Sequence, residues 1–409
     1  MTENNELRIA VIGAGPAGVY SSDIFLRQLK KTGAELGLGE NARIDLFEKL
    51  PVPFGLVRYG VAPDHPSIKF IADALEKTLD NPNIHLYCDV EFGKDVTLDE
   101  LLARYDAVLF ATGAVEDKPL GLPGADLDGV YGAAKFVEWY DGYPTGARTW
   151  PLEAEEVAVI GGGNVAMDVT RSAIRLGASH TTIVYRRRKD DMTALPAEVE
   201  GAVAEGAEIL ELHAPERIET DENGWVTALW ASPKMIGLIK DGRPSPASSG
   251  EPSLRIPCDV VIVAIGQGIE TRHFEDAGIP IRRGVIQAAN WSAVEHAPGV
   301  FAGGDCVTGP ATVIRAIAAG KVAAANIDQY LGYNHIISVD VDIPDADFSD
   351  RPPCGRVNMK ERDANERKHD FQLAECPMSL KEANQEAHRC LRCDRFGYGS
   401  FKGGRTTEW

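Results

Sequence analysis

Three glycines at the spacing G-x-G-x-x-G follow a short apolar segment near the N-terminus. Residues 9–12 are apolar or small and lead directly into Gly13, Gly15 and Gly18. A strand covered on both faces of a parallel sheet has this character, and residues 19–30 carry a helical apolar pattern. In such a turn the first glycine permits a tight bend, the second lets the backbone approach a pyrophosphate, and the third lets the helix pack on the strand. The order of strand, turn and helix predicts a dinucleotide site, although the glycine pattern alone is weak evidence.

A carboxylate at the end of the second predicted strand, residues 43–47, indicates which dinucleotide binds. Glu48 stands where such a domain reads the ribose. A carboxylate accepts hydrogen bonds from ribose hydroxyls but repels a 2′-phosphate, which favours an unphosphorylated ADP moiety and hence FAD. Glu48 follows Gly18 by 30 residues, whereas about 20 is usual. We interpret the polar residues 31–42 as a loop insertion.

The same device occurs a second time with the opposite charge at the ribose position. The repeat begins with a predicted strand at 155–160 and a G-x-G-x-x-A turn from Gly161 to Ala166. A predicted helix at 166–176 and a second strand at 181–185 follow. Arg186 lies 20 residues past Ala166 and is followed by Arg187. A guanidinium binds a 2′-phosphate bidentately, so this arginine pair predicts NADP(H). The alternative is a solvated basic run after a strand.

Asp305 and the helix that follows it are candidates for contacts with the flavin. Asp305 ends a predicted strand, residues 300–306, where it could hydrogen-bond the ribityl or phosphate part of a flavin. The N-terminus of the predicted helix 312–331 would point the backbone amides of Thr312 and Val313 at the pyrimidine end of the ring, where the helix dipole stabilises negative charge. A generic N-cap is the alternative interpretation.

Two further residues could take part in proton transfer. His65 lies in residues 50–70, a long apolar loop rich in proline and glycine, and long ordered loops tend to be functional. It is a candidate proton relay or nicotinamide-positioning group, although a single loop histidine is commonly structural. Glu198 opens a predicted helix, residues 198–205, where an acid also simply complements the helix dipole.

Four of the seven cysteines lie in the last 56 residues: Cys354, Cys376, Cys390 and Cys393. The C-x-x-C spacing of Cys390 and Cys393 lets two thiolates bind one metal or one cluster iron, and Cys354 and Cys376 could complete four ligands. An iron–sulfur cluster, a zinc ion and a tail that only docks on a partner all remain open.

Length and composition place the chain among multidomain globular proteins. It has 409 residues, 25% of them charged, and a formal net charge of −19. This balance makes nucleic-acid or anionic-membrane binding unfavourable, and no apolar run reaches the ~18 residues needed to span a bilayer. The polar N-terminus leads straight into the first strand, so we expect no secretory signal and a cytoplasmic location. We find no cysteine pair between Glu48 and Cys88, which disfavours disulfide-reductase chemistry.

Residues 46–68 contain FEKLPVPFGLVRYGVAPDHPSI, which strongly resembles the adrenodoxin-reductase type of ferredoxin–NADP reductase. The segments GGGNVAMD, VYRRR, LPAEVE and FAGGDCVTGPATVIRAIAAGK resemble the small subunit of glutamate synthase. The resemblance, which covers about residues 8–331, implies that FAD is lined by Gly13, Gly15, Gly18, Glu48, Lys49, Leu56, Thr112, Gly113, Gly304, Asp305, Thr312 and Val313. It implies that NADPH is held by Gly161, Gly163, Asn164, Val165, Arg186 and Arg187, with Lys118 near its phosphates. His65 and Glu198 match a pair that the reductase family places beside the nicotinamide.

The chain also departs from both families. Adrenodoxin-type reductases carry a tryptophan shortly before the flavin-contacting helix, where this chain has Gly303, Gly304 and Asp305. The segment EAHRCLRCD, residues 386–394, resembles part of the cluster segment that glutamate-synthase small subunits carry at their N-terminus. These departures bear on the electron acceptor more than on the fold.

We predict an α/β, glutathione-reductase-like fold with two Rossmann-like dinucleotide-binding domains and a cysteine-containing tail. Residues 1–118 and 267–335 would form the FAD domain, 119–266 the inserted NADP domain, and 336–409 an acidic linker and tail. Within these limits we predict helices at 68–80 and 98–104, strands at 84–90, 106–113 and 259–266, and antiparallel ribbons at 209–212, 226–230 and 234–239.

Such a protein would take hydride from NADPH and pass electrons to an iron–sulfur acceptor such as ferredoxin, or run in reverse. The second hypothesis is a flavoprotein subunit that feeds the clusters of a partner enzyme, as in glutamate synthase or transhydrogenase-type assemblies. The third is a non-catalytic sensor that binds NADP and FAD.

Overall fold

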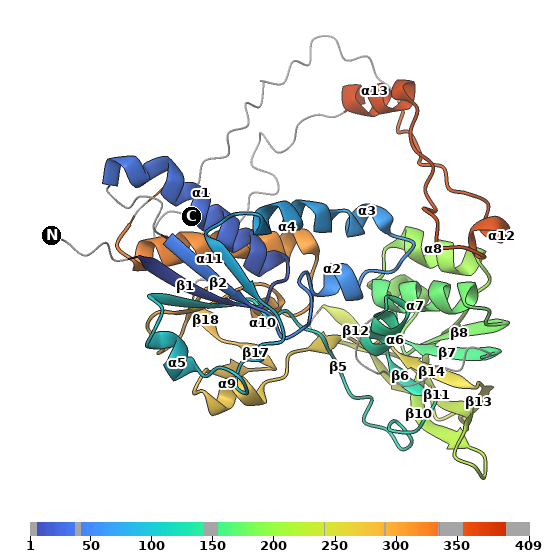
Figure 1. Cartoon of the computed structure of the whole chain (residues 1–409). Helices are drawn as coiled ribbons and strands as arrows, with labels where there is room; N and C mark the ends of the chain where they lie inside the picture. The colour runs from blue at the N-terminus through green and yellow to red at the C-terminus, as the bar shows by residue number, and fades with distance from the viewer. Residues whose placement is uncertain are drawn as a thin grey trace.

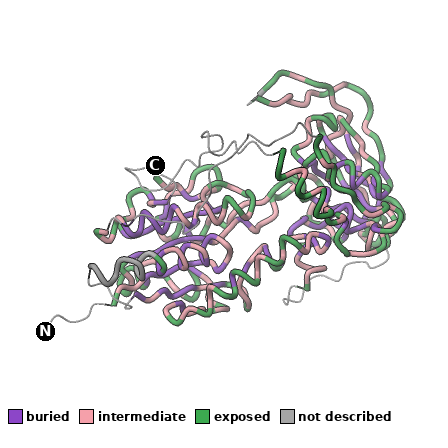
Figure 2. Tube along the Cα trace, turned by 90° about the horizontal axis from the view of Figure 1, so that it is seen from above, coloured by how far each residue is buried: buried purple, intermediate pink, exposed green. Residues whose placement is uncertain are grey.

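A computed structural model of the chain describes residues 6–36, 42–142, 154–240, 242–289, 292–333, 335 and 355–389. Two sheets lie side by side and are covered by helices, and a C-terminal segment extends over the second sheet's helices (Figure 1). Buried residues concentrate inside each of the two parts (Figure 2). Among the described residues, no helix is long and apolar enough to cross a bilayer.

The first sheet has seven strands around the glycine turn at Gly13. Their order is β18 (Ala288–Ala289), β19 (Ala293–Val294), β20 (Val300–Ala302), β4 (Ala107–Phe110), β1 (Leu7–Ile12), β2 (Ala42–Phe47) and β3 (Ile84–Tyr87). The five strands from β20 to β3 are parallel. The apolar residues of the four inner strands are mostly buried, whereas Tyr87 of the edge strand β3 is exposed. Helices α1 (Pro16–Leu36) and α11 (Val313–Tyr330) pack together on one face, beside α4 (Ile71–Leu79).

The second sheet consists of five parallel strands formed between residues 130 and 263. Their order is β6 (Val130–Gly132), β14 (Val260–Val263), β7 (Glu156–Ile160), β8 (His180–Tyr185) and β9 (Glu208–Glu211). Helices α6 (Ala133–Tyr140), α7 (Asn164–Arg175) and α8 (Pro196–Ala204) contribute to its core. The antiparallel ribbon predicted for residues 209–212 is therefore wrong, because β9 pairs in parallel with β8 at the edge of this sheet.

A separate antiparallel ribbon packs against the other face of the second sheet. It comprises β10 (His213–Thr220), β11 (Val226–Lys240), β12 (Arg243–Ser248) and β13 (Leu254–Pro257). The two strands predicted at 226–230 and 234–239 form one strand, β11, which continues through Pro233. Proline does not break it because β11 changes partner there: β10 pairs with residues 226–233, and β12 pairs with residues 234–240.

Two short strands join the two parts of the molecule. β5 (Glu116–Asp117) pairs in antiparallel fashion with β15 (Gln267–Gly268), so both chain crossings between the sheets run side by side. Asp117 accepts hydrogen bonds from the backbone N–H groups of Ala134 (2.9 Å) and Lys135 (3.2 Å), which ties this ribbon to the start of α6. We propose that the domain limits lie at these crossings, near residues 118 and 266.

Short elements complete the described chain. They are α2 (Leu56–Tyr59), α3 (Pro66–Lys69), α5 (Leu98–Leu102), the 3-10 helix η1 (Lys189–Asp191), α9 (Arg272–Asp276), β16 (Ile281–Arg282), β17 (Val285–Ile286), α10 (Asp305–Thr308), α12 (Ala364–Arg367) and α13 (Leu380–Arg389). The helix predicted at 68–80 is not continuous, because α3 ends at Lys69 and α4 begins at Ile71, with a turn at Phe70. Lys69 of α3 pairs with Asp141, and Leu75 of α4 packs in the first core.

The insertion predicted at residues 31–42 is only partly a loop. α1 continues to Leu36, and β2 already begins at Ala42. Residues 37–41 lie outside the described chain. Most residues from 31 to 36 are compatible with a helix, and a single glycine costs only about 1 kcal/mol in a helix, so the pattern of polar residues alone could not end α1.

Candidate functional site

A cavity of about 990 Å³ lies between the two parts and is lined by both glycine-rich turns. It contains most of the residues predicted to bind the two dinucleotides. They are Gly13, Gly15, Glu48, Lys49, Leu56, Thr112, Gly113, Gly161, Gly163, Asn164, Val165, Arg186, Arg187, Gly304, Asp305, Thr312 and Val313. A single cavity therefore reaches from the first carboxylate position to the second arginine pair.

The first turn has the geometry that its three glycines predict. Gly13 has φ +107°, and a Cβ atom there would lie 2.4 Å from the carbonyl oxygen of Ala111. A Cβ atom at Gly15 would meet nothing within 4 Å, so this stretch of backbone faces open space in the cavity. A Cβ atom at Gly18 would lie 2.0 Å from the Gly13 carbonyl oxygen. Gly18 therefore acts through helix packing, and it does not line the cavity.

Glu48 is buried at the end of β2, with 6% of its surface exposed. Its Oε2 accepts a hydrogen bond from the Ala14 backbone N–H (2.8 Å), and its Oε1 accepts one from the Leu50 N–H (3.0 Å). Burial raises the pKa of Glu48, and these two amides oppose the rise. Each carboxylate oxygen can accept a second hydrogen bond, so Glu48 retains acceptor capacity toward the cavity.

The floor of the first site is formed where β4 and β20 end. Gly113 has φ +72°, and a Cβ atom there would meet nothing within 4 Å. Burial raises the pKa of Asp305, and the Ala311 backbone amide opposes the rise. Thr312 caps α11 by accepting a hydrogen bond from the Arg315 N–H (3.4 Å). The N-cap interpretation of Thr312 thus holds, and the cap residue and Val313 also line the cavity.

The second turn repeats this geometry at the start of α7. Gly161 has φ +153°, and a Cβ atom there would lie 2.3 Å from the carbonyl oxygen of Ala264. A Cβ atom at Gly163 would meet only the Thr193 hydroxyl, at 3.5 Å. Asn164 accepts a hydrogen bond from the Leu195 N–H (2.8 Å), which fixes the chain that leads into α8. The backbone N–H groups at the α7 N-terminus form the kind of site that binds phosphate.

The arginines after β8 differ in their partners. Arg188 forms a two-pronged contact with Asp191, at 3.0 and 3.2 Å, so its charge is already paired. The Nε of Arg187 donates to the carbonyl oxygen of Pro244 (2.7 Å). Arg186 is exposed, and within the described chain neither Arg186 nor Arg187 forms an ion pair. These two guanidinium groups are therefore available to an anion in the cavity.

Lys118 does not line the cavity, although we expected it near the phosphates. Its backbone N–H donates to the Gly266 carbonyl oxygen (3.1 Å) beside the β5–β15 ribbon. Its Nζ would lie 3.7 Å from a Cβ atom at Gly266. The structure thus places Lys118 at the crossing between the two parts.

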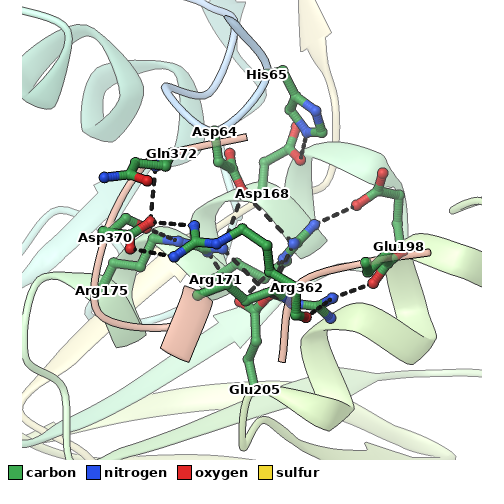
Figure 3. Close-up of polar contacts among 12 residues, drawn as sticks. Asp64, His65, Asp168, Arg171, Arg175, Glu198, Glu205, Arg362, Asp370 and Gln372 are labelled. Carbon is green, nitrogen blue, oxygen red and sulfur yellow. Dashed lines mark hydrogen bonds and ion pairs between the residues drawn. The ribbon is translucent and has the colours of Figure 1, made fainter. Parts of the chain in front are cut away.

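His65 and Glu198 meet beside α7 and not in the cavity lining. The Nε2 of His65 lies 3.2 Å from Oδ1 of Asp168, and one polar atom each of His65, Asp168 and Glu198 lies within 4.8 Å of the others. Figure 3 shows His65 directed at Asp168. The Asp168 carboxylate holds the pKa of His65 above its ordinary value, although burial opposes this. Sequence patterns gave no indication of Asp168, because its partner lies 103 residues away.

A largely buried ion network adjoins this group through Glu198 (Figure 3). Arg171 donates to Glu198 (2.8 Å) and to Glu205 (2.8 Å), and its Nη2 lies 3.8 Å from Asp64. Arg175 lies 3.4 Å from the same Asp64 carboxylate and 3.0 Å from Glu205. Asp64 belongs to the loop of the first part, so the network crosses between the two parts.

The C-terminal segment docks on this network. The Nε of Arg367, from α12, donates to Glu205 (2.8 Å), and only 3% of Arg367 is exposed. Arg175 donates to the backbone oxygen of Asp370 (2.7 Å) and lies over the Phe371 ring. Of the four tail cysteines, only Cys376 belongs to the described chain, where it is a free, half-buried thiol. Cys354, Cys390 and Cys393 lie outside the described residues, so their predicted role as ligands stays a prediction.

The sequence model of the pyridine nucleotide-disulphide oxidoreductase family matches residues 7–320. The chain belongs to this family. The match spans both sheets and both glycine-rich turns, which accounts for the repeated strand, turn and helix units. The same two-domain fold occurs in thioredoxin reductase of T. acidophilum, with a TM-score of 0.56 at 19% identity over 79% of this chain and 97% of that one.

Relatives in this oxidoreductase family include electron-transfer proteins. The chain is 34% identical to the NADP(+)-dependent formate dehydrogenase subunit beta of Moorella thermoacetica, over 95% of this chain and 55% of that protein. It is 44% identical to the mitochondrial NADPH:adrenodoxin oxidoreductase of Drosophila melanogaster, over 43% of this chain and 36% of that protein. The structure of Mycobacterium tuberculosis FprA in complex with NADPH gives a TM-score of 0.71 at 25% identity, covering 80% and 85% of the two chains. The chain therefore spans about half of the formate dehydrogenase subunit and about a third of the adrenodoxin oxidoreductase.

Proposed function

We propose that this protein is an FAD-dependent oxidoreductase that takes hydride from NADPH and passes electrons to an iron–sulfur acceptor such as ferredoxin, or runs in reverse. The observation that carries this proposal is the single cavity lined by both glycine-rich turns. When bound there, the two dinucleotides would supply the hydride chemistry, and the protein would bind, orient and shield them.

The residues at the first turn fit FAD. Open space beside Gly15 and Gly113 leaves room for a pyrophosphate against the backbone. Glu48 can accept a hydrogen bond from a ribose hydroxyl, and as a buried carboxylate it disfavours a 2′-phosphate at this end. The N-terminus of α11, at Thr312 and Val313, would direct backbone amides at the pyrimidine end of the ring.

The residues at the second turn fit NADPH. Gly161 and Gly163 let the backbone approach a pyrophosphate at the N-terminus of α7. Arg186 and Arg187, with no carboxylate paired to them in the described chain, would hold the 2′-phosphate. The proposed role of His65 and Glu198 next to the nicotinamide rests on the resemblance alone, because both residues lie outside the cavity lining and His65 contacts Asp168 instead.

A second candidate is a subunit that feeds electrons to a partner enzyme. The observation that favours it is the alignment over 95% of this chain with two proteins named as beta subunits, of NADP(+)-dependent formate dehydrogenase and of NADPH-Fe(3+) oxidoreductase. The alignments extend well beyond the family match, which ends at residue 320.

We propose a cytoplasmic location for either form, supported by the free thiols of Cys88, Cys258, Cys306 and Cys376 in the described chain.

The choice of nicotinamide dinucleotide tests the proposal directly. In Arg186→Ala/Arg187→Ala, we expect the preference for NADPH over NADH in kcat/KM to be lost. Each charge-assisted contact to the 2′-phosphate contributes on the order of 1.5–3 kcal/mol. Arg188→Ala is the matched control, because Arg188 is already paired with Asp191. We expect this variant to keep the wild-type preference for NADPH. A wild type without preference for NADPH would refute the assignment.

The acceptor is tested by electron transfer to a ferredoxin. Rapid reduction of ferredoxin by the purified protein with NADPH would support the freestanding reductase. Activity that appears only when a partner co-purifies would support the subunit. Fast reduction of disulfide substrates without ferredoxin activity would contradict both.

A further inference from the structure

The hairpin of β11 and β12 reaches the arginine end of the cavity. Lys240 pairs with Arg243 at its tip, and Met235 pairs with Ala247 further down. The hairpin is tied to the segment after β8 by the Arg187 Nε, which donates to the Pro244 carbonyl oxygen (2.7 Å). The start of β12 therefore lies beside the arginines that follow β8.

Arg243 is the first residue of β12 and lines the same cavity as Arg186 and Arg187. Its Nη2 donates to the backbone oxygen of Asp191 (2.7 Å) and to the Tyr185 hydroxyl (3.3 Å). The Tyr185 hydroxyl itself donates to the same Asp191 oxygen (2.9 Å). Two neutral oxygens thus fix one edge of the Arg243 guanidinium without neutralising its charge.

The free edge of Arg243 remains available to a ligand. Within the described chain, no hydrogen bond uses its Nε or Nη1, and no carboxylate forms an ion pair with it. The nearby acid Asp191 is already paired with Arg188 through both carboxylate oxygens. Arg186, Arg187 and Arg243 therefore form a group of three unneutralised guanidiniums at one end of the cavity, in a chain whose net charge is −19.

We propose that Arg243 is a specificity-determining residue that binds the 2′-phosphate of NADP(H) together with Arg186 and Arg187. The proposal rests on the proposed function of the second turn. A 2′-phosphate carries close to two negative charges at pH 7 and offers three acceptor oxygens, so it can engage more than one guanidinium. The Arg187 bond to Pro244 also means that the hairpin orients one of the other two arginines.

The hairpin therefore belongs to the nucleotide site and not to the core of the second part, because Met235, Leu238 and Ile239 are exposed. Glycine-turn and strand-end patterns place only Arg186 and Arg187 at the ribose. Arg243 lies 56 residues after Arg187 in the chain, and the antiparallel pairing of β12 with β11 brings it to the same end of the cavity. No spacing rule for a dinucleotide fold predicts such a residue.

The test compares Arg243→Ala with wild type in calorimetric titrations of NADP+ and NAD+ against the FAD-loaded protein. We expect the Kd for NADP+ to rise roughly 10- to 100-fold, with the Kd for NAD+ unchanged within about twofold. Titration of 2′,5′-ADP against 5′-AMP isolates the phosphate, and we expect the same selective loss. Arg243→Lys, which keeps a charge but not the guanidinium geometry, should lose part of the affinity.

Arg255→Ala is the matched control, because Arg255 lies on β13 of the same ribbon and pairs with Glu219 away from the cavity lining. It should leave both dissociation constants unchanged. An Arg243→Ala protein that binds NADP+ as tightly as wild type, or that loses NADP+ and NAD+ affinity equally, would overturn the inference. If wild type itself binds NADP+ no better than NAD+, the proposed function fails. If Arg186→Ala loses the discrimination while Arg243→Ala keeps it, only the role of Arg243 fails.

Discussion

Glu205 carries the negative charge at the centre of the buried ion network, and its removal has the largest predicted effect on stability. Its side chain is fully buried and accepts hydrogen bonds from Arg171 (2.8 Å), Arg175 (3.2 Å) and Arg367 (2.8 Å). The change Glu205→Gln keeps the shape but removes the charge. Arg171 and Arg175 would then share Asp64, with the partly exposed Glu198 also on Arg171. Arg367 would keep only the exposed Glu361.

The magnitude follows from the cost of leaving buried charges without a partner. Removing one member of a buried ion pair typically costs about 3–5 kcal/mol of unfolding free energy, and we expect Glu205→Gln to fall in this range. Burial alone would raise the pKa of Glu205, but Arg171, Arg175 and Arg367 outweigh it and lower the pKa below its ordinary value. The contribution is therefore present above about pH 4.5 and is lost as the pH falls through the lowered pKa.

Urea unfolding at pH 7 measures the change, with limited proteolysis to detect release of the C-terminal segment. Asp276→Asn is the control, because Asp276 pairs with Arg272 at 3.8 Å and both side chains are largely exposed. An exposed pair contributes at most about 1 kcal/mol. If Glu205→Gln loses no more stability than Asp276→Asn and the C-terminal segment stays protected, the interpretation of the network is wrong.

Three further predictions concern the sites themselves. Asp168→Asn should lower the pKa of His65 toward its ordinary value, measured by NMR titration of the His65 ring, because the Asp168 carboxylate is the main cause of the rise. Gly13→Ala should largely abolish retention of FAD, measured by the visible spectrum of the purified protein, because a Cβ atom would lie 2.4 Å from a backbone oxygen. If the C-terminal cysteines hold an iron–sulfur cluster, Cys390→Ser/Cys393→Ser should remove iron and acid-labile sulfide from anaerobically purified protein, measured by metal and sulfide analysis.

Each of these predictions has an outcome that would contradict it. If the pKa of His65 is the same in Asp168→Asn as in wild type, His65 and Asp168 are not in contact in solution. For the turn, Gly224→Ala is a matched control, since Gly224 also has positive φ (+86°) but a Cβ atom there would meet nothing within 4 Å; equal loss of flavin in both variants would point to general instability. Wild type that is free of iron and zinc yet fully active would leave the tail as a docking segment.

The His65–Asp168 contact also predicts a pH dependence of stability with a defined sign. The pKa of His65 is raised in the folded protein, so its contribution is fully present below the ordinary histidine value of about 6.5. It is lost as the pH rises through the raised pKa. Asp168→Asn should therefore flatten the stability profile above about pH 6.5.

The sequence predicted those parts of the fold whose signals are local. The parallel strands around Gly13 and Gly161 could be predicted because strands buried on both faces must be apolar and because each turn needs glycine at fixed positions. The residue that reads the ribose could also be predicted, because it directly follows the second strand of each unit: Glu48 in the first and Arg186 in the second. Both residues line the cavity.

The parts that sequence patterns missed depend on contacts between distant residues. β11 continues through Pro233 because two different strands pair with its two halves, which no local propensity reveals. Asp168 and Arg171 look like ordinary polar residues of an amphipathic helix. Their roles appear only when the loop at Asp64 and His65 packs on α7 from the other part of the chain.

The β5–β15 ribbon restricts twisting of the two parts of the molecule against each other. A single crossing chain would allow rotation about its own axis, whereas two crossings hydrogen-bonded at Asp117 and Gln267 resist such twisting. A relative motion of the two parts would therefore meet less resistance as a bend across the ribbon than as a twist. Such a bend would have to break the contacts of Lys69 with Asp141 (2.9 Å) and of His65 with Asp168 (3.2 Å), together with the ion pairs of Asp64.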